Sequence, residues 1–195
     1  MDKIQQQREH FNSVAERYHS ARKDPNHLLL KSLIWSYFLH KHQELRKPNL
    51  RVLEAMCGFG DGKAILENTL NIPIDYHGFD YSDEVLDALK HEQSKLKVFH
   101  ADAGTVDLDE NHYDLIILLG GLHHVPHIAK DVVQRLTKAI RPGGHFINLE
   151  PTNGNPLFGM IRDKIYARNT LFDEETERAF EVEELLDFFT NAGLR

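Results

Sequence analysis

The sequence has little cysteine, a shortage of basic residues and no long apolar run. Cys57 is the one cysteine among 195 residues, which excludes an intramolecular disulfide and a zinc site built from several cysteines. This cysteine usage is typical of a reducing compartment, so we expect a cytoplasmic protein. No apolar run approaches the roughly 18 residues that a membrane helix needs, and the first residues lack the apolar core of a signal peptide. We therefore expect neither secretion nor a membrane partner.

The charge balance bears on the kind of partner. There are 23 lysines and arginines against 30 acidic residues, which gives a formal net charge of −7. Such a balance argues against a broad electrostatic contact with phosphate backbones, so we expect a small-molecule partner and no nucleic acid. The chain also has no internal repeat, low-complexity tract or Gly/Ser linker, which predicts a single domain over residues 1–195.

Hydrophobic periodicity divides the chain into three parts. Helical spacing at 4–22 and 27–46 predicts a helical cap over residues 1–47. From 48 to 150, short apolar runs alternate with amphipathic segments, and Pro142-Gly143-Gly144 predicts a turn. The expected strands are 50–55, 74–79, 96–101, 113–119 and 145–150. The expected helices are 61–70, a segment capped by Ser82, 128–140, 157–167 and 181–191.

The alternation of strands and helices predicts the fold class. Each strand followed by a helix implies right-handed crossovers between parallel strands. We therefore expect an α/β, Rossmann-like, doubly wound and mostly parallel sheet with helices on both faces. Ligands of such sheets bind outside the carboxyl ends of the strands, so the residues that follow each strand are the candidate site.

A glycine-rich loop follows the first expected strand. Glu54 lies at the strand end, and Gly58, Gly60 and Gly62 occupy alternate positions before a helix. Glycine allows positive φ and close approach of the backbone to a ligand, and the start of a helix offers free N–H groups. This pattern indicates a ligand-binding loop without naming the ligand.

Spacing argues against two phosphate-binding loops. A P-loop ending at Gly62-Lys63 would need glycine at position 57 and a hydroxyl at position 64, where the chain has Cys57 and Ala64. The dinucleotide pattern G-x-G-x-x-G starting at Gly58 would need glycine where Lys63 stands. What remains is a pattern of strand-end acids combined with glycines.

Five motifs between about 50 and 150 occur in a recognisable order. They are Glu54-Ala-Met-Cys-Gly-Phe-Gly60, His77-Gly-Phe-Asp-Tyr-Ser82, His100-Ala-Asp-Ala103, Tyr113-Asp-Leu-Ile-Ile117 and Arg141-Pro-Gly-Gly144 at the end of an amphipathic helix. This series resembles the ordered motifs of class I S-adenosylmethionine-dependent methyltransferases of the small-molecule type. The resemblance implies S-adenosyl-L-methionine as the cofactor and residues 48–150 as the cofactor-binding core.

The resemblance also implies roles for the first two strand ends. Glu54, Gly58 and Gly60 would lie beside the methionine part of the cofactor, whose cationic sulfur and amine favour a carboxylate. Asp80 would accept the ribose hydroxyls, and Tyr81 would pack on the adenine. Taken alone, an acid at any one of these positions also fits a strand-end or helix-capping role. The occurrence of all these acids at the matching positions of successive strands is what favours the cofactor.

Further roles follow from the later motifs and from the N-terminus. Asp102 and Ala103 match the position that contacts the edge of the adenine, and Leu119 precedes the contacts with the donor methyl group and the acceptor. Tyr18 would close over the methionine moiety, although its helix has the spacing of one that simply packs on the sheet. Met56 departs from the usual glycine and could narrow the methionine pocket.

Three histidines follow the fourth strand. His123 or His124 could act as the base that removes a proton from an acceptor, since histidine titrates near neutral pH. His127 follows them. The alternative is that Leu-His-His is a common loop in this family and that alignment of the acceptor suffices. We expect no metal site, because no carboxylate falls at a supporting spacing in the sequence.

The last part of the chain departs from the family pattern. Residues 151–180 look like an acceptor-side insertion, and a last helix completes the segment 151–195. The sequence ends where the last two strands of the family would begin. That arrangement would leave a sheet edge open, so we expect a homodimer or limited stability.

The most economical interpretation is an S-adenosylmethionine-dependent enzyme that methylates a small molecule on oxygen, nitrogen or carbon. The alternative is a non-catalytic module with the same fold, which Met56 and the early end of the sequence favour. Methylation of RNA or protein is a third interpretation. It would require a basic groove or an amide-Pro-Pro-aromatic motif, and the sequence has Leu119-Gly-Gly-Leu122 in that place.

Overall fold

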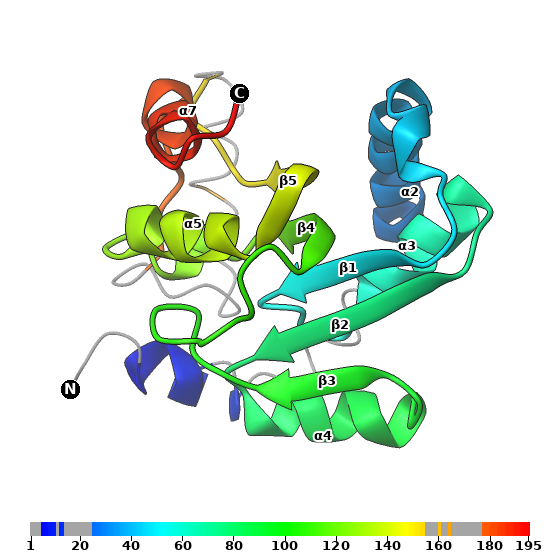
Figure 1. The fold of residues 1–195 in the computed structure, drawn as a ribbon. Helices are drawn as coiled ribbons and strands as arrows, with labels where there is room; N and C mark the ends of the chain where they lie inside the picture. The colour runs from blue at the N-terminus through cyan, green and yellow to red at the C-terminus, as the bar shows by residue number, and fades with distance from the viewer. Residues whose placement is uncertain (1–4, 11, 14–24, 155–159, 161–163, 165–176) are drawn as a thin grey trace.

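The protein is built on one parallel sheet. A computed structural model describes residues 5–10, 12–13, 25–154, 160, 164 and 177–195. Within them, five strands form a sheet of order β3-β2-β1-β4-β5 (Figure 1). The strands are β1 (Leu50–Ala55), β2 (Ile74–Asp80), β3 (Lys97–His100), β4 (Tyr113–Leu119) and β5 (Ile140–Leu149). The helices are α2 (Pro25–Lys41), α3 (Asp61–Leu70), α4 (Asp83–Glu92), α5 (Ala129–Lys138) and α7 (Val182–Asn191), with short 3-10 helices η1 (Gln43–Leu45) and η2 (Leu122–His124).

The strand order confirms the doubly wound topology predicted from the sequence. The chain runs outward from β1 through β2 to β3, and then returns to the other side of β1 for β4 and β5. All neighbouring strands pair in parallel. The direction of winding reverses beside β1, so the carboxyl ends of β1, β2 and β4 meet where ligands of such sheets bind.

Alternating side chains of the central strands bury both faces of the sheet. Leu53 and Ile116 pack in a cluster with residues of α5 and α7, whereas Val52 and Leu115 pack in a second cluster with residues of α2 and α3. These two pairs of helices lie on opposite sides of the sheet in Figure 1. Burial on both faces explains why 113–119 reads as an almost unbroken apolar run.

The fifth strand differs from the expectation. β5 begins at Ile140, and the expected turn at 142–144 lies inside it as an irregularity. Tyr113 pairs with Ile140 and the next pair joins Leu115 to His145, so the intervening residues bulge out of the ladder. Pairing with β4 resumes beyond the bulge, which keeps the segment in the sheet. The helix expected over 157–167 lies almost entirely outside the described residues.

Asp114 ties together three segments at the amino end of β4. Its side chain is only 2% exposed. It accepts hydrogen bonds from Lys47 Nζ at 2.6 Å and from the Arg51 backbone N–H at 2.8 Å, and Arg141 Nη1 lies 2.8 Å from the same carboxylate. Burial alone would raise the pKa of Asp114, but Lys47, the Arg51 amide and Arg141 outweigh it and hold the pKa below its usual value.

Replacing Asp114 with alanine is expected to destabilise the protein by about 2 kcal/mol at pH 7, because charge-assisted hydrogen bonds are lost while the half-exposed cations return to water. The folded-state pKa lies below the unfolded value of about 3.9, so this contribution is complete above pH 5 and disappears as the pH falls through the folded-state pKa. Urea unfolding across this pH range measures both effects. Asp109→Ala, whose carboxylate is 87% exposed, is the matched control, and an equal loss in the two variants would contradict the prediction.

Candidate functional site

A pocket opens at the carboxyl edge of the sheet, where β1, β2 and β4 end. It encloses about 520 Å³, including the part open to solvent. This volume lies in the range of roughly 300–1,000 Å³ that small-molecule sites occupy. The lining residues are Glu54, Met56, Cys57, Gly58, Asp80, Tyr81, Ser82, Val85, Leu119, Gly120, Gly121 and His124. Among the described residues, the lining has two carboxylates and no lysine or arginine, so this part of the lining favours a cationic ligand over a phosphate.

Glu54 is a buried carboxylate, 2% exposed, at the end of β1. Both its oxygens lie 3.2 Å from the backbone N–H of Gly62 in the first turn of α3, and the hydroxyl of Tyr76 donates to Oε2 at 2.5 Å. A Cβ at Gly62 would lie 2.8 Å from that carboxylate, so a larger residue would not fit there. Burial and then the charge of Glu54 raise the pKa of Tyr76, so the phenol remains a donor at neutral pH. These contacts fix the carboxylate in the pocket wall.

Asp80 ends β2 and faces the glycine loop. Its Oδ2 accepts the backbone N–H of Gly58 at 2.9 Å, and its Oδ1 accepts the N–H of Ser82 at 3.0 Å. Gly58 has φ +51°, a left-handed conformation that suits glycine. The hydroxyl of Ser82 in turn accepts from the N–H of Val85, which caps α4 as the sequence predicts. One carboxylate therefore holds both loops that border this side of the pocket.

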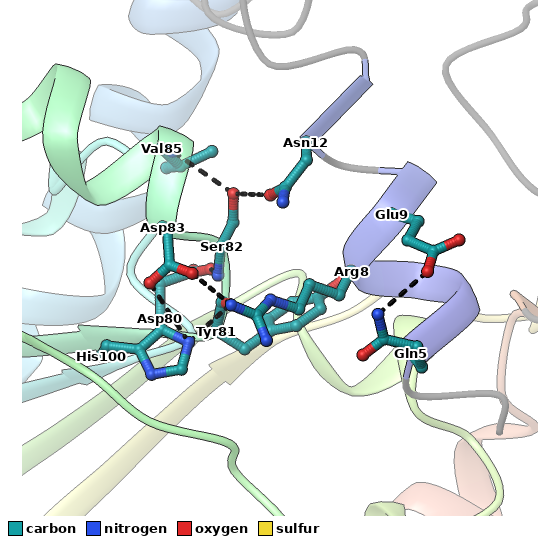
Figure 2. Close-up of polar contacts among 10 residues, drawn as sticks. All are labelled: Gln5, Arg8, Glu9, Asn12, Asp80, Tyr81, Ser82, Asp83, Val85 and His100. Atoms are coloured by element: carbon teal, nitrogen blue, oxygen red, sulfur yellow. Dashed lines mark hydrogen bonds and ion pairs between the residues drawn. The ribbon is translucent and has the colours of Figure 1, made fainter.

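The described N-terminal residues lie against the β2–α4 loop (Figure 2). The hydroxyl of Ser82 donates to Asn12 Oδ1 at 2.6 Å, and Arg8 forms an ion pair with Asp83 at the start of α4. Tyr18, which the resemblance places over the cofactor, lies outside the described residues. The two contacts nevertheless bring the N-terminal segment to the loop that carries Asp80 and Tyr81.

The remaining predicted cofactor residues lie outside the pocket lining. Gly60 has φ +68° and forms the N-cap of α3, where its conformation turns the loop into the helix. Asp102 follows β3 and accepts the N–H of Gly104 at 2.7 Å, in a turn of its own. Ala103 is 5% exposed and packs in the cluster on the α5 face. The structure thus gathers Glu54, Gly58, Asp80, Tyr81 and Leu119 around the pocket, and it gives Gly60, Asp102 and Ala103 local roles nearby.

Met56 makes the pocket wall unusual. Its φ of +52° is a conformation in which a side chain other than glycine is strained. The thioether lies where a side chain at Gly121 would be, because a Cβ at Gly121 would come within 2.8 Å of Met56 Sδ. The sequence identifies Met56 as a departure from the family pattern, and the structure shows that Gly121 makes room for it.

Glu150 binds the turn that carries the histidines, a role that was not predicted from the sequence. The carboxylate accepts the backbone N–H of Gly121 at 2.9 Å, of Leu122 at 2.8 Å and of His123 at 3.3 Å. His123 Nδ1 lies 2.8 Å from Glu150 Oε2. Because a carboxylate only accepts, the proton resides on Nδ1, which leaves Nε2 of His123 as the basic atom.

A second carboxylate, Glu177, reaches the neighbouring histidine. Its Oε1 lies 3.1 Å from His124 Nδ1, and the two side chains are 2% and 10% exposed. The rings of His123 and His124 are 3.9 Å apart between centroids. Burial lowers the pKa of His124, as does His123, although Glu177 opposes the shift. His124 is therefore neutral at pH 7, and it is the histidine of the pair that lines the pocket.

Within the described part of the chain, no helix combines the length and the apolar character needed to cross a membrane.

Comparisons with known proteins agree with this geometry. Residues 52–144 match a family whose description is "Methyltransferase domain". The chain is 25% identical over 170 residues to a demethylmenaquinone methyltransferase of Bacillus mycoides, an alignment that covers 76% of this chain and 71% of that protein. It is also 25% identical over 169 residues to the corresponding enzyme of Bacillus cytotoxicus, with the same coverage.

Solved structures show the same fold. An S-adenosylmethionine-dependent methyltransferase of Thermotoga maritima, described as a possible histamine N-methyltransferase, superposes with a TM-score of 0.71 at 18% identity over 95% of this chain and 80% of that one. One from Archaeoglobus fulgidus has a TM-score of 0.63 at 16% identity, over 84% of this chain and 69% of its own. Together, these findings show that residues 52–144 match a methyltransferase domain, and that the parallel sheet has the fold of S-adenosylmethionine-dependent methyltransferases.

Proposed function

We propose that this protein transfers the methyl group of S-adenosylmethionine to a small-molecule acceptor. The observation that carries the proposal is the pocket at the carboxyl ends of β1, β2 and β4, where the residues that the structure describes supply Glu54 and Asp80 and no lysine or arginine. This donor set fits a cofactor that is cationic at sulfur and amine. When bound, S-adenosylmethionine supplies an electrophilic methyl group on a sulfonium.

The strand-end residues would hold the cofactor in the order that the resemblance implies. Asp80 would accept the ribose hydroxyls through the lone pairs left by its two loop amides, and Tyr81 would pack on the adenine. Glu54 and Gly58 would border the methionine part. Asp102 and Ala103 remain predictions for the adenine edge, and Gly60 remains one for the shape of the loop. Tyr18 remains a prediction for closure over the methionine part.

The acceptor would approach along Leu119 and the two glycines that follow it. His124 lines this part of the pocket, and the ring of His123 lies 3.9 Å from that of His124, with its Nδ1 engaged by Glu150. We assign the activation of the acceptor to this pair. Support for a small acceptor comes from the relatives, which are named for demethylmenaquinone and, in one structure, for histamine. Those names describe other proteins, so they define compounds to test.

Calorimetry with S-adenosylmethionine and S-adenosylhomocysteine, with NAD as the negative control, tests the cofactor assignment. Transfer of a radiolabelled methyl group to a panel of quinols, catechols and amines, including a demethylmenaquinol analogue and histamine, tests the reaction. We expect micromolar binding of both cofactor forms, none of NAD, and transfer to at least one class of acceptor. Binding without transfer to any of them would support a non-catalytic module, and absence of binding would overturn the proposal.

A further inference from the structure

His123, His124 and Glu177 form a buried cluster that the cofactor site does not account for. One nitrogen from each ring and one carboxylate oxygen all lie within 4.8 Å of one another. The sequence has no carboxylate close enough to the histidines to suggest a metal site. The fold brings Glu177, which is far from them in sequence, next to both rings. We propose that these three residues bind a divalent transition-metal ion.

The donor set decides the class of metal. Two imidazoles and one carboxylate suit zinc, cobalt, nickel or ferrous iron, whereas magnesium and calcium prefer oxygen ligands alone. Three ligands with bonds of about 2.0–2.2 Å to one ion lie roughly 3.3–3.8 Å from one another. The three ligand atoms here lie within 4.8 Å of one another, and His124 Nδ1 is already 3.1 Å from Glu177 Oε1. Closing the site therefore requires a shift of at most about 1 Å in the widest pair, which side-chain rotation can supply.

The surroundings also match those of a metal site. Ligating histidines commonly donate their second ring N–H to a carboxylate, which fixes the ring and leaves the other nitrogen free for the metal. Glu150 does this for His123 at 2.8 Å, and the N–H groups of Gly121 and Leu122 hold Glu150 in place.

A second cluster offers a contrast within the same chain. His42, Glu44 and His145 also bring three ligand atoms within 4.8 Å, but their side chains are 40%, 54% and 32% exposed. Within the part of the chain that the structure describes, both of these histidines contact the exposed Glu44, and neither contacts a buried carboxylate. We therefore place the specific site at His123, His124 and Glu177, and use the exposed cluster as a control.

The position of the ion would matter for the reaction. His124 lines the pocket, so an ion there would face the end of the cavity where we place the acceptor. Metal coordination lowers the pKa of a bound hydroxyl or thiol, which makes its oxygen or sulfur a better nucleophile at neutral pH. An ion at this place would favour acceptors that have a metal-binding oxygen or sulfur, and this role in the reaction rests on the proposed function. The binding of the metal ion does not depend on the proposed function.

Metal binding can be measured on the full chain without an acceptor. The chelator-treated protein is titrated with Co²⁺ followed by visible absorption, and then with Zn²⁺ in competition. We expect one ion per chain with the intense absorption of a low-coordinate cobalt site, and at least tenfold weaker binding in Glu177→Gln and in His124→Asn. The control His42→Asn should bind as the unaltered chain does.

The outcomes separate this inference from the proposed function. Equal cobalt affinity in the unaltered chain and in both cluster variants, or loss of the signal in His42→Asn alone, would overturn the buried site. Calorimetry with S-adenosylmethionine on the same samples shows that each variant folds and retains its cofactor pocket. A protein that binds cobalt through Glu177 but does not bind S-adenosylmethionine would keep this inference and reject the cofactor assignment.

Discussion

Replacing Asp80 with alanine is expected to weaken the binding of S-adenosylmethionine by at least about 100-fold. Two hydrogen bonds from ribose hydroxyls to a carboxylate contribute about 3 kcal/mol together, which corresponds to that factor. The substitution also releases the N–H groups of Gly58 and Ser82, which both bond to Asp80, so the two loops lose their common anchor. Isothermal titration calorimetry measures the change.

Two companion variants show whether the loss belongs to the carboxylate. Asp80→Asn keeps one acceptor oxygen for the loops and the ribose, so its affinity should lie between those of the alanine variant and the unaltered chain. Asp87→Ala removes an exposed carboxylate from α4 and should leave binding unchanged. If Asp80→Ala folded with an unchanged melting temperature and bound the cofactor normally, Asp80 would not be a cofactor ligand.

Replacing His123 with asparagine is expected to lower kcat/KM by about 100-fold, with the affinity for S-adenosylmethionine changed less than about twofold. Proton removal by a positioned group typically contributes about 10²- to 10⁴-fold to a rate, and loss of a metal ligand would disable the same site. His123 is absent from the pocket lining, so cofactor binding should survive. Asparagine retains an N–H donor for Glu150. Steady-state methyl transfer and calorimetry on the same protein separate the two effects.

His127 provides the control for this experiment. It lies in the same loop but its side chain is exposed. His127→Asn should leave both kcat/KM and cofactor affinity unchanged. Equal losses of turnover in the two variants would point to a general disturbance of the loop, and full activity in His123→Asn would leave alignment of the acceptor as the source of the rate.

Sequence periodicity was sufficient for the sheet because its strands are buried on both faces. The apolar run 113–119 and the strand at 50–55 could be recognised from their own residues, and β1 and β4 occupy those bounds. β5 was harder to predict. Pro142, Gly143 and Gly144 have the local preferences of a turn, but pairing with β4 on both sides of the bulge carries the strand through them. Long-range pairing outweighed local preference there.

The candidate site likewise has one part that could be predicted from the sequence and one part that could not. Glu54 and Asp80 could be predicted because the end of a parallel strand determines where its next residues lie. The partners of the histidines could not. Glu150 lies 27 residues after His123, and Glu177 lies 53 residues after His124, so no local spacing relates them. The position of Glu150 was the clearest indication of its role in the sequence. It is an acid directly after the fifth strand, and this places it at the edge of the sheet where ligands bind.

The contact between Met56 and Gly121 couples the effects of substitutions at the two positions. Met56 occupies part of the space that a side chain at position 121 would need, and Leu118 occupies the rest: a Cβ there would lie 2.8 Å from Met56 Sδ and 2.8 Å from Leu118 Cδ2. A smaller residue at position 56 would therefore remove one of these two clashes. Conversely, glycine at position 56 would relieve a backbone strain of about 1–2 kcal/mol and leave a gap beside Gly121. Substitutions at the two positions should therefore be non-additive: a side chain at position 121 should cost less stability when position 56 is glycine than when it is methionine.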